Sequence, residues 1–360
     1  MKLYDTTNED LLFELNLKKD ELSDLIISKG SYDVNDFALV RTTDYLPQDN
    51  VIKPICDVPF VTHINSPFRD AIYRKLSNER NINPFNEDEY DAFMKEIDNY
   101  TPLSTQYRST IHFTLNGLVS SHDKGNFEGR NFIIIDKLSK HLGNDNIKSV
   151  RMEDTYMMGN VTLSSDAIIL VDESMYQKLL DVYPYLENYN VVLYKGDPKI
   201  AVEMVLAEQK ICPEEILSSY AKYTERTPLY TDFIAKLNDT YSIESTPHYQ
   251  SEVYKEDDNK SLELWKYYDF DFMKYLLNKF VDNDEEKSEL LNSFNEIYFD
   301  REKCINYVLS IIERIGLDRY IKLVSEYNLN IMSNIQKGDY PTNNEILESN
   351  NLSLSNNNQR

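Results

Sequence analysis

Hydrophobic and polar residues alternate with different periods along the chain, and these periods predict where helices and strands lie. Near the N-terminus, leucine and isoleucine recur three or four positions apart, which predicts a helix capped by Thr6 and Glu9 and ended by Gly30. Residues 37–47 then have the apolar and β-branched density of a strand. From about 107 to 195, short apolar runs separated by Gly, Asn and Asp predict further strands with a helix among them.

The strand pattern ends near Cys212, and helical periodicity continues from there to about residue 335. We therefore expect an α/β domain, a mixed sheet with flanking helices, followed by an all-α helical domain. The C-terminal residues are rich in Asn and Ser and have no periodic apolar face, which is typical of disorder. The predicted parts are an N-terminal helical segment (1–36), an α/β domain with a polar cleft (37–212), an acidic helical domain (213–337) and a disordered tail (338–360).

A row of polar side chains follows one face of the strand predicted at 109–115. Because side chains alternate along a strand, Ile111, Phe113 and Leu115 point to one face and form core. The opposite face carries Thr110, His112, Thr114 and Asn116. Short hydroxyl groups beside a histidine and an amide are typical of a cleft that binds a polar ligand. A solvated sheet face is the alternative explanation of the same row.

The segment 120–130 after this strand contains polar and charged side chains between glycines, and it offers His122 and Arg130 as further ligand contacts. A surface loop whose glycines form turns is the alternative. The spacing from His122 to Arg130 is similar to that of the nucleotide-transferring Fic loop. Lys124 stands where that loop has a phenylalanine, and the Gly-Asn pair is displaced, so we exclude this assignment.

Charged residues next to two other predicted strands are also candidates for a site. Glu153 and Asp154 follow a strand at 147–152, where a carboxylate can bind a ribose hydroxyl or act as a general base. A solvated turn explains these acids equally simply. Arg41 continues the row of Phe37 and Leu39, and it is suited either to bind a phosphate or to pair with one of the many acids.

The order of these groups resembles that of ADP-ribosyltransferase toxins of the arginine, serine-threonine-serine, glutamate type. An arginine on an early strand is followed by the Thr-Ile-His-Phe-Thr strand and then by an acidic strand end, within residues 37–172. The resemblance implies NAD as a substrate, with Arg41 on its phosphates. It further implies that Thr110 and Thr114 brace the nicotinamide-ribose pocket and that Glu153 holds the ribose hydroxyl.

The same resemblance implies an aromatic side chain, Tyr156 or Phe127, that stacks on the nicotinamide. We place His112 beside Glu153 as the expected catalytic pair. The chain departs from the family pattern at two places. First, the strand reads Ser-Thr-Ile-His-Phe-Thr rather than Ser-Thr-Ser. The acidic strand end reads Glu-Asp-Thr where the family has Glu-x-Glu.

Composition narrows the classes of partner. With 61 acidic against 38 basic residues the formal net charge is −23, which disfavours nucleic acid and anionic membranes as partners and leaves a protein partner or protein substrate. Three widely spaced cysteines predict neither a disulfide framework nor a metal site. The chain shows no signal-peptide pattern and no run of 18 apolar residues, so we expect a cytoplasmic protein, or one exported without a cleavable signal.

The sequence thus leaves two functions from different classes. The first is a toxin-like or effector-like transferase that uses a nucleotide, with NAD as the candidate, to modify a macromolecular target. The alternative is a non-enzymatic acidic protein that binds or inhibits a partner by covering a basic site on it. The P-loop, the dinucleotide-binding glycine fingerprint, the zinc-protease motif and the hydrolase elbow have no match in the sequence.

Overall fold

The chain folds into two compact units in the computed structural model. The structure describes residues 1–54, 66–80, 82–83, 85–117, 127, 129–143, 146–150, 155–213, 226–243 and 250–357. One unit, the sheet unit, comprises Met1–Pro54 and Thr110–Ser251. The other, the helical unit, comprises Ile55–Ser109 and Glu252–Arg360. Each unit is therefore assembled from two separate stretches of sequence.

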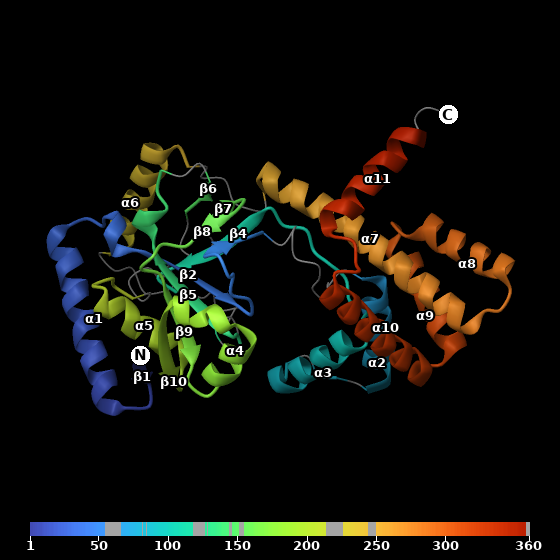
Figure 1. The fold of residues 1–360 in the computed structure, drawn as a ribbon, viewed down its shortest axis with the longest axis horizontal. Coiled ribbons are helices and arrows are strands. Elements are labelled where there is room, and N and C mark those ends of the chain that lie inside the picture. The colour runs from blue at the N-terminus through green and yellow to red at the C-terminus, as the bar shows by residue number, and fades with distance from the viewer. Residues whose placement is uncertain are drawn as a thin grey trace. The chain divides into compact units, whose positions relative to one another are not determined.

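The sheet unit contains an eight-stranded mixed sheet, which confirms the predicted α/β class (Figure 1). Its strands are, in spatial order, β1 (Lys2–Asp5), β10 (Asn190–Lys195), β9 (Ile168–Asp172), β5 (Phe132–Lys137), β2 (Ala38–Thr43), β4 (Thr110–Leu115), β7 (Thr155–Met158) and β6 (Ile147–Ser149). The first three are parallel, and every pair from β9 to β6 is antiparallel. Two short strands, β3 (Val51–Ile52) and β8 (Val161–Thr162), pair separately.

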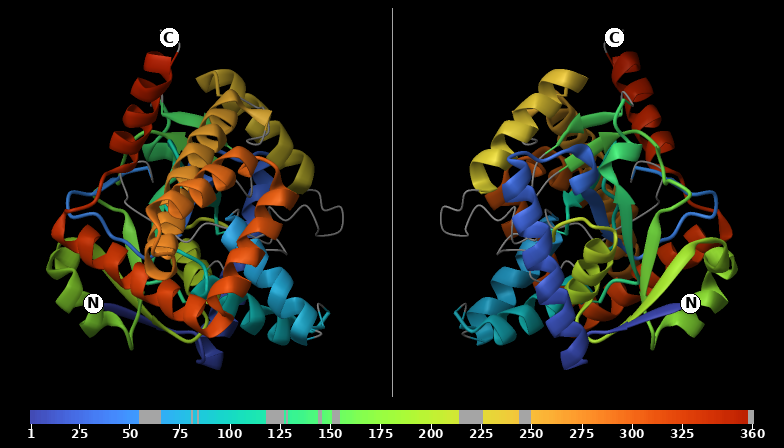
Figure 2. Two further views of the ribbon diagram at one scale, coloured as in Figure 1. Left: turned by 90° about the vertical axis from the view of Figure 1, so that its right-hand side faces the viewer. Right: turned by 90° about the vertical axis from the view of Figure 1, so that its left-hand side faces the viewer.

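Helices cover both faces of this sheet. The helices of the unit are α1 (Glu9–Lys29), α4 (Tyr176–Val182), α5 (Pro198–Glu208) and α6 (Arg226–Tyr241). Val40 on one sheet face packs in a core cluster with Leu15 of α1 and Val205 of α5. Leu39, on the opposite face, belongs to a second cluster with residues of α4 and α6. The right-hand view of Figure 2 shows α1 in front of the unit, with α5 beside it.

The ends of these helices test the sequence rules for caps. Gly30 ends α1 in the left-handed conformation at φ 68°, as predicted. The N-cap of α1 is Asn8, whose side chain accepts hydrogen bonds from the backbone of Asp10 and Leu11, so the predicted capping box at Thr6 and Glu9 is wrong. The reason is a long-range contact, because the Thr6 hydroxyl donates to the carbonyl of residue 195 and accepts from the amide of residue 197.

The helical unit packs around one long helix, α7 (Glu252–Phe280). Its other helices are α2 (Pro67–Arg80), α3 (Glu87–Asn99), α8 (Asp284–Ile297), α9 (Arg301–Ile315), α10 (Leu317–Lys337) and α11 (Asn343–Asn357). Phe68, Phe272 and Phe294 lie in its fully buried core. A buried carboxylate, Asp269, accepts hydrogen bonds from Ser66 Oγ and Tyr298 OH, both at 2.8 Å.

The units differ from the predicted domains in three places, although the order of fold classes is confirmed. Helices α2 and α3 belong to the helical unit, where Phe68 of α2 packs edge-on against Phe272 of α7 with the ring centres 4.9 Å apart. Helix α6 belongs to the sheet unit, where its Phe233 stacks on Phe37 with the ring centres 4.7 Å apart. The N-terminal segment 1–36 supplies the edge strand β1 and helix α1 to the sheet unit. The predicted domain boundary at 212–213 is therefore wrong.

The segment predicted as a disordered tail also folds. Residues 343–357 form α11, and Ile346 and Leu347 are buried against Leu264 and Tyr268 of α7. The four aliphatic residues of this segment do not produce a periodic pattern, but one packing partner is enough to bury Ile346 and Leu347. Among the residues that the structure describes, none of the helices combines the length and the apolar composition that a bilayer span requires.

Candidate functional site

The polar row of β4 has the alternation that the sequence predicted. Ile111, Phe113 and Leu115 are buried in the core cluster on one face of the sheet. On the other face, His112 and Thr114 are partly exposed, whereas Thr110 and Asn116 are buried. The strand therefore leaves one imidazole and one hydroxyl partly exposed on this face, beside buried neighbours such as Val40, which is in register with Thr114.

His112 is held by neighbours on three sides. Its Nε2 lies 3.1 Å from Thr110 Oγ1, a hydrogen-bond distance. Strands β4 and β7 pair so that His112 is opposite Tyr156, and the two rings lie 5.8 Å apart on the same face. Arg41 donates through Nη1 to the carbonyl oxygen of His112 at 2.8 Å. The imidazole is thus restrained through its ring, its nitrogen and its backbone.

Arg41 does not join His112 on one face of the sheet, which corrects the predicted phosphate-binding role. In β2 it is in register with Ile134 of β5 and alternates with Val40, so its side chain leaves from the face of Leu39 and Ile134. The guanidinium instead binds the backbone of β4 at His112. We assign Arg41 as a positioning residue for that strand.

Asn116 is a structural residue rather than a ligand contact. Its Oδ1 accepts from the amide of Ala38 at 2.7 Å, and its Nδ2 donates to the carbonyl oxygens of Asp36 at 3.1 Å and Cys212 at 2.9 Å. Both ends of the amide are therefore occupied by backbone groups. Thr114 is also bound internally, because its hydroxyl donates to the carbonyl of Val40 at 3.3 Å.

The predicted aromatic contacts are buried, and the predicted arginine contact is paired. Tyr156 is fully buried and Phe127 is 5% exposed, so neither ring is available to stack on a nicotinamide. Arg130 forms an ion pair with Asp44 at the surface. The remaining predicted residues, Glu153 and His122, lie outside the described residues.

A second polar cluster, which the sequence did not indicate, is buried in the sheet unit. Asp136 at the end of β5 accepts from His141 Nε2 at 2.9 Å and from the backbone amide and hydroxyl of Ser164. Burial alone would raise the pKa of Asp136, but the hydrogen bonds from His141 and Ser164 outweigh burial and lower that pKa. The carboxylate lies between the serine and the histidine, so this cluster joins two chain segments and does not activate a nucleophile.

Neither cluster has the arrangement of a metal centre. Within the described ranges, no group of His, Cys, Asp and Glu side chains is placed to hold a metal ion.

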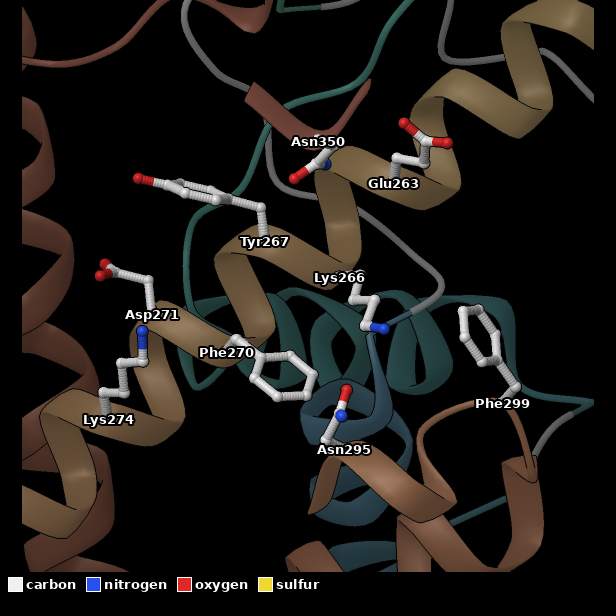
Figure 3. Close-up of a pocket in the computed structure, with 9 residues that line it drawn as sticks. All are labelled: Glu263, Lys266, Tyr267, Phe270, Asp271, Lys274, Asn295, Phe299 and Asn350. Atoms are coloured by element: carbon white, nitrogen blue, oxygen red, sulfur yellow. The ribbon is translucent and has the colours of Figure 1, made fainter. Parts of the chain in front are cut away.

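The helical unit carries a groove of about 540 Å³, which also was not predicted (Figure 3). Its floor is the solvent-facing stripe of α7, which consists of Glu263, Lys266, Tyr267, Phe270, Asp271 and Lys274. Asn295 of α8, Phe299 just after that helix and Asn350 of α11 form its walls. Along α7 these residues are alternately three positions and one position apart, which is the spacing of one helix face. This spacing could have identified the groove floor from the sequence, but it does not identify the helices that enclose the groove.

No family model matches the chain, and no curated protein and no solved structure matches it either.

Proposed function

We propose that the sheet unit is the catalytic part of a transferase that takes a group from a nucleotide, with NAD as the candidate donor, and attaches it to a macromolecular target. The observation that supports this proposal is the restrained and partly exposed imidazole of His112. An imidazole held in one orientation by a hydroxyl, a ring and a braced backbone is preorganised for proton transfer. The choice of NAD as donor is supported by what remains of the ADP-ribosyltransferase resemblance, the Thr110–Thr114 strand followed by Glu153, since Arg41 leaves the sheet on the other face.

In this proposal His112 is the general base. The bond between the ribose anomeric carbon and the nicotinamide nitrogen breaks, and nicotinamide leaves with the bonding electrons. The acceptor nucleophile forms the new bond to the anomeric carbon, and its proton passes to His112. Thr110 orients the imidazole, and Arg41 keeps the β4 backbone in place beneath it. Glu153 is the proposed anion that stabilises positive charge on the ribose.

A second candidate, the acidic binding or inhibitor protein, is favoured by the surface of α8. This helix carries Asp284, Glu285, Glu286, Glu289 and Glu296 against Lys287 alone. A helix with that charge bias is suited to a basic surface on a partner protein. Binding of this kind requires no nucleotide, and this difference separates the two candidates.

The test is a calorimetric titration of the full chain with NAD and with ATP. We expect NAD to bind to the parent, and His112→Gln to abolish turnover, followed as nicotinamide release, because the base is lost. Thr110→Val should reduce turnover roughly fivefold, because it removes the hydrogen bond of about 1 kcal/mol that orients the His112 imidazole. Thr162→Val is the matched control, because Thr162 is exposed on β8 in the same unit. If the parent protein binds neither nucleotide, the transferase proposal fails and the binding protein is favoured.

A further inference from the structure

The groove on the helical unit has the size and the composition of a site for a small ligand. Its volume of about 540 Å³ lies within the range of roughly 300–1,000 Å³ that is typical of ligand pockets. The opposite face of α7, which includes Leu264, Phe272 and Leu276, is buried in the core of the unit. The groove floor is therefore part of a rigid helix, which is a better platform for binding than a loop.

Lys266 is the central charged group of the groove, and aromatic rings surround its ammonium. Its Nζ lies 4.9 Å from the ring centre of Phe299, 5.6 Å from that of Phe270 and 5.9 Å from that of Tyr298. These rings attract the cation through their negative faces but accept no proton from it. In Figure 3 the side chains of Lys266, Phe270, Asn295 and Phe299 point toward a common space.

The two lysines of the groove have no carboxylate partner among the residues that the structure describes. Neither Lys266 nor Lys274 forms an ion pair within 4.0 Å, although acidic residues outnumber basic ones in this chain by 61 to 38. An ammonium that has exchanged part of its water for aromatic rings gains more from an incoming anion than an exposed one does. The groove therefore offers an anion contact directly beside flat apolar surfaces.

The charge balance of the groove decides how much negative charge its ligand carries. The ammonium groups of Lys266 and Lys274 are matched by the carboxylates of Glu263 and Asp271 in the same lining. A ligand with several negative charges would be repelled by these carboxylates, whereas a single anionic group can contact Lys266 without meeting them. A monoanion thus fits this lining better than a polyphosphate.

We propose that this groove binds a small aromatic carboxylate. The carboxylate contacts the ammonium of Lys266, and the ligand ring lies against Phe270 and Phe299. The amide of Asn295 provides a further hydrogen-bond partner at the same end of the groove. This site uses none of the residues of the proposed transferase site, and it goes beyond that proposed function.

The test uses three probes on the full chain by calorimetry. Indole-3-acetate carries both the ring and the charge, indole-3-ethanol lacks the charge, and acetate lacks the ring. We expect indole-3-acetate to bind with a dissociation constant below about 1 mM and the other two to bind at least about tenfold more weakly. Adenosine monophosphate, a dianion, should also bind more weakly than indole-3-acetate.

Matched variants then identify the groove as the binding site. Lys266→Met should weaken indole-3-acetate binding about tenfold or more. Lys266→Arg, which keeps the positive charge, should bind indole-3-acetate about as the parent does. Phe299→Ala should also weaken binding, and it leaves folding intact because Phe299 is 69% exposed. Lys287→Met on α8 is the control, because Lys287 pairs with Asp284 outside the groove.

Several results would overturn the assignment. They are no binding of indole-3-acetate to the parent protein, equal affinity for indole-3-ethanol, tighter binding of adenosine monophosphate, or unchanged affinity in Lys266→Met. The variant His112→Gln should bind indole-3-acetate as the parent does. Failure of this proposal and failure of the transferase proposal therefore give different results.

Discussion

The buried carboxylate of Asp136 allows a stability prediction that can be worked out from its contacts. Its side chain is 1% exposed and accepts from the backbone amides of Lys137 and Ser164 at 2.9 Å and 2.8 Å. It also accepts from His141 Nε2 and from the hydroxyl of Ser164. Asp136→Ala leaves these donors without an acceptor in a buried site. Breaking a buried paired group of this kind costs about 3–5 kcal/mol of unfolding free energy.

Asp136→Asn separates the loss of hydrogen bonds from the loss of volume. The asparagine has nearly the same shape, but its amide nitrogen cannot accept from Ser164 or His141, so we expect a loss of about 2–3 kcal/mol. Asp166→Ala is the control from the same region, because Asp166 is half exposed and lies 3.8 Å from Lys140. An exposed pair of that kind contributes about 0–1 kcal/mol.

Hydrogen exchange at increasing urea concentration, followed by mass spectrometry on peptides from β5 and β9, measures the unfolding of the sheet unit itself. Because the folded pKa of Asp136 is lowered, its contribution is complete above the unfolded pKa of about 3.9 and is lost as the pH falls through the folded value. The difference between parent and Asp136→Ala should therefore be constant near neutral pH and shrink below about pH 4. If the unfolding free energies of both Asp136 variants lie within about 1 kcal/mol of that of the parent at pH 7, the buried hydrogen bonds of Asp136 do not stabilise the sheet unit as proposed.

Three further predictions concern the backbone and the thiols. Asn116→Ala should lower the unfolding free energy by about 2–3 kcal/mol in urea titrations, because it removes backbone partners from a buried turn; a neutral effect would contradict its structural role. Gly196→Ala should lower Tm clearly more than Gly30→Ala, because a Cβ at position 196 would clash with Thr6 Oγ1, whereas no atom lies within 4 Å of a Cβ placed on Gly30; equal shifts would contradict this. Burial raises the pKa of the Cys304 thiol to about 12, so iodoacetamide at pH 8 should label it only after unfolding, and mass spectrometry of the labelled native protein would reveal any exception.

Local sequence determined the elements whose signals lie within a few residues of one another. The period of two along β4 was sufficient to assign Ile111 and Phe113 to the core, because strand geometry alone sets that alternation. Asp197 and Pro198 begin α5 in the same local way, since a cap acts on the first turn of its own helix. The order of the fold classes, with the sheet first and the helices later, followed from the change in the period of the hydrophobic pattern along the chain.

Tertiary structure decided everything that depends on which segments meet. The sequence placed Arg41 in the row of Leu39, but only the pairing of β2 with β4 and β5 shows that this row is on the face away from His112. Asn116 binds backbone groups 78 and 96 positions away, a use that no local pattern contains. The α7 groove likewise needs α8 and α11 as walls. Local geometry is encoded in neighbouring residues, whereas the burial and charge environment of a side chain is determined by distant ones.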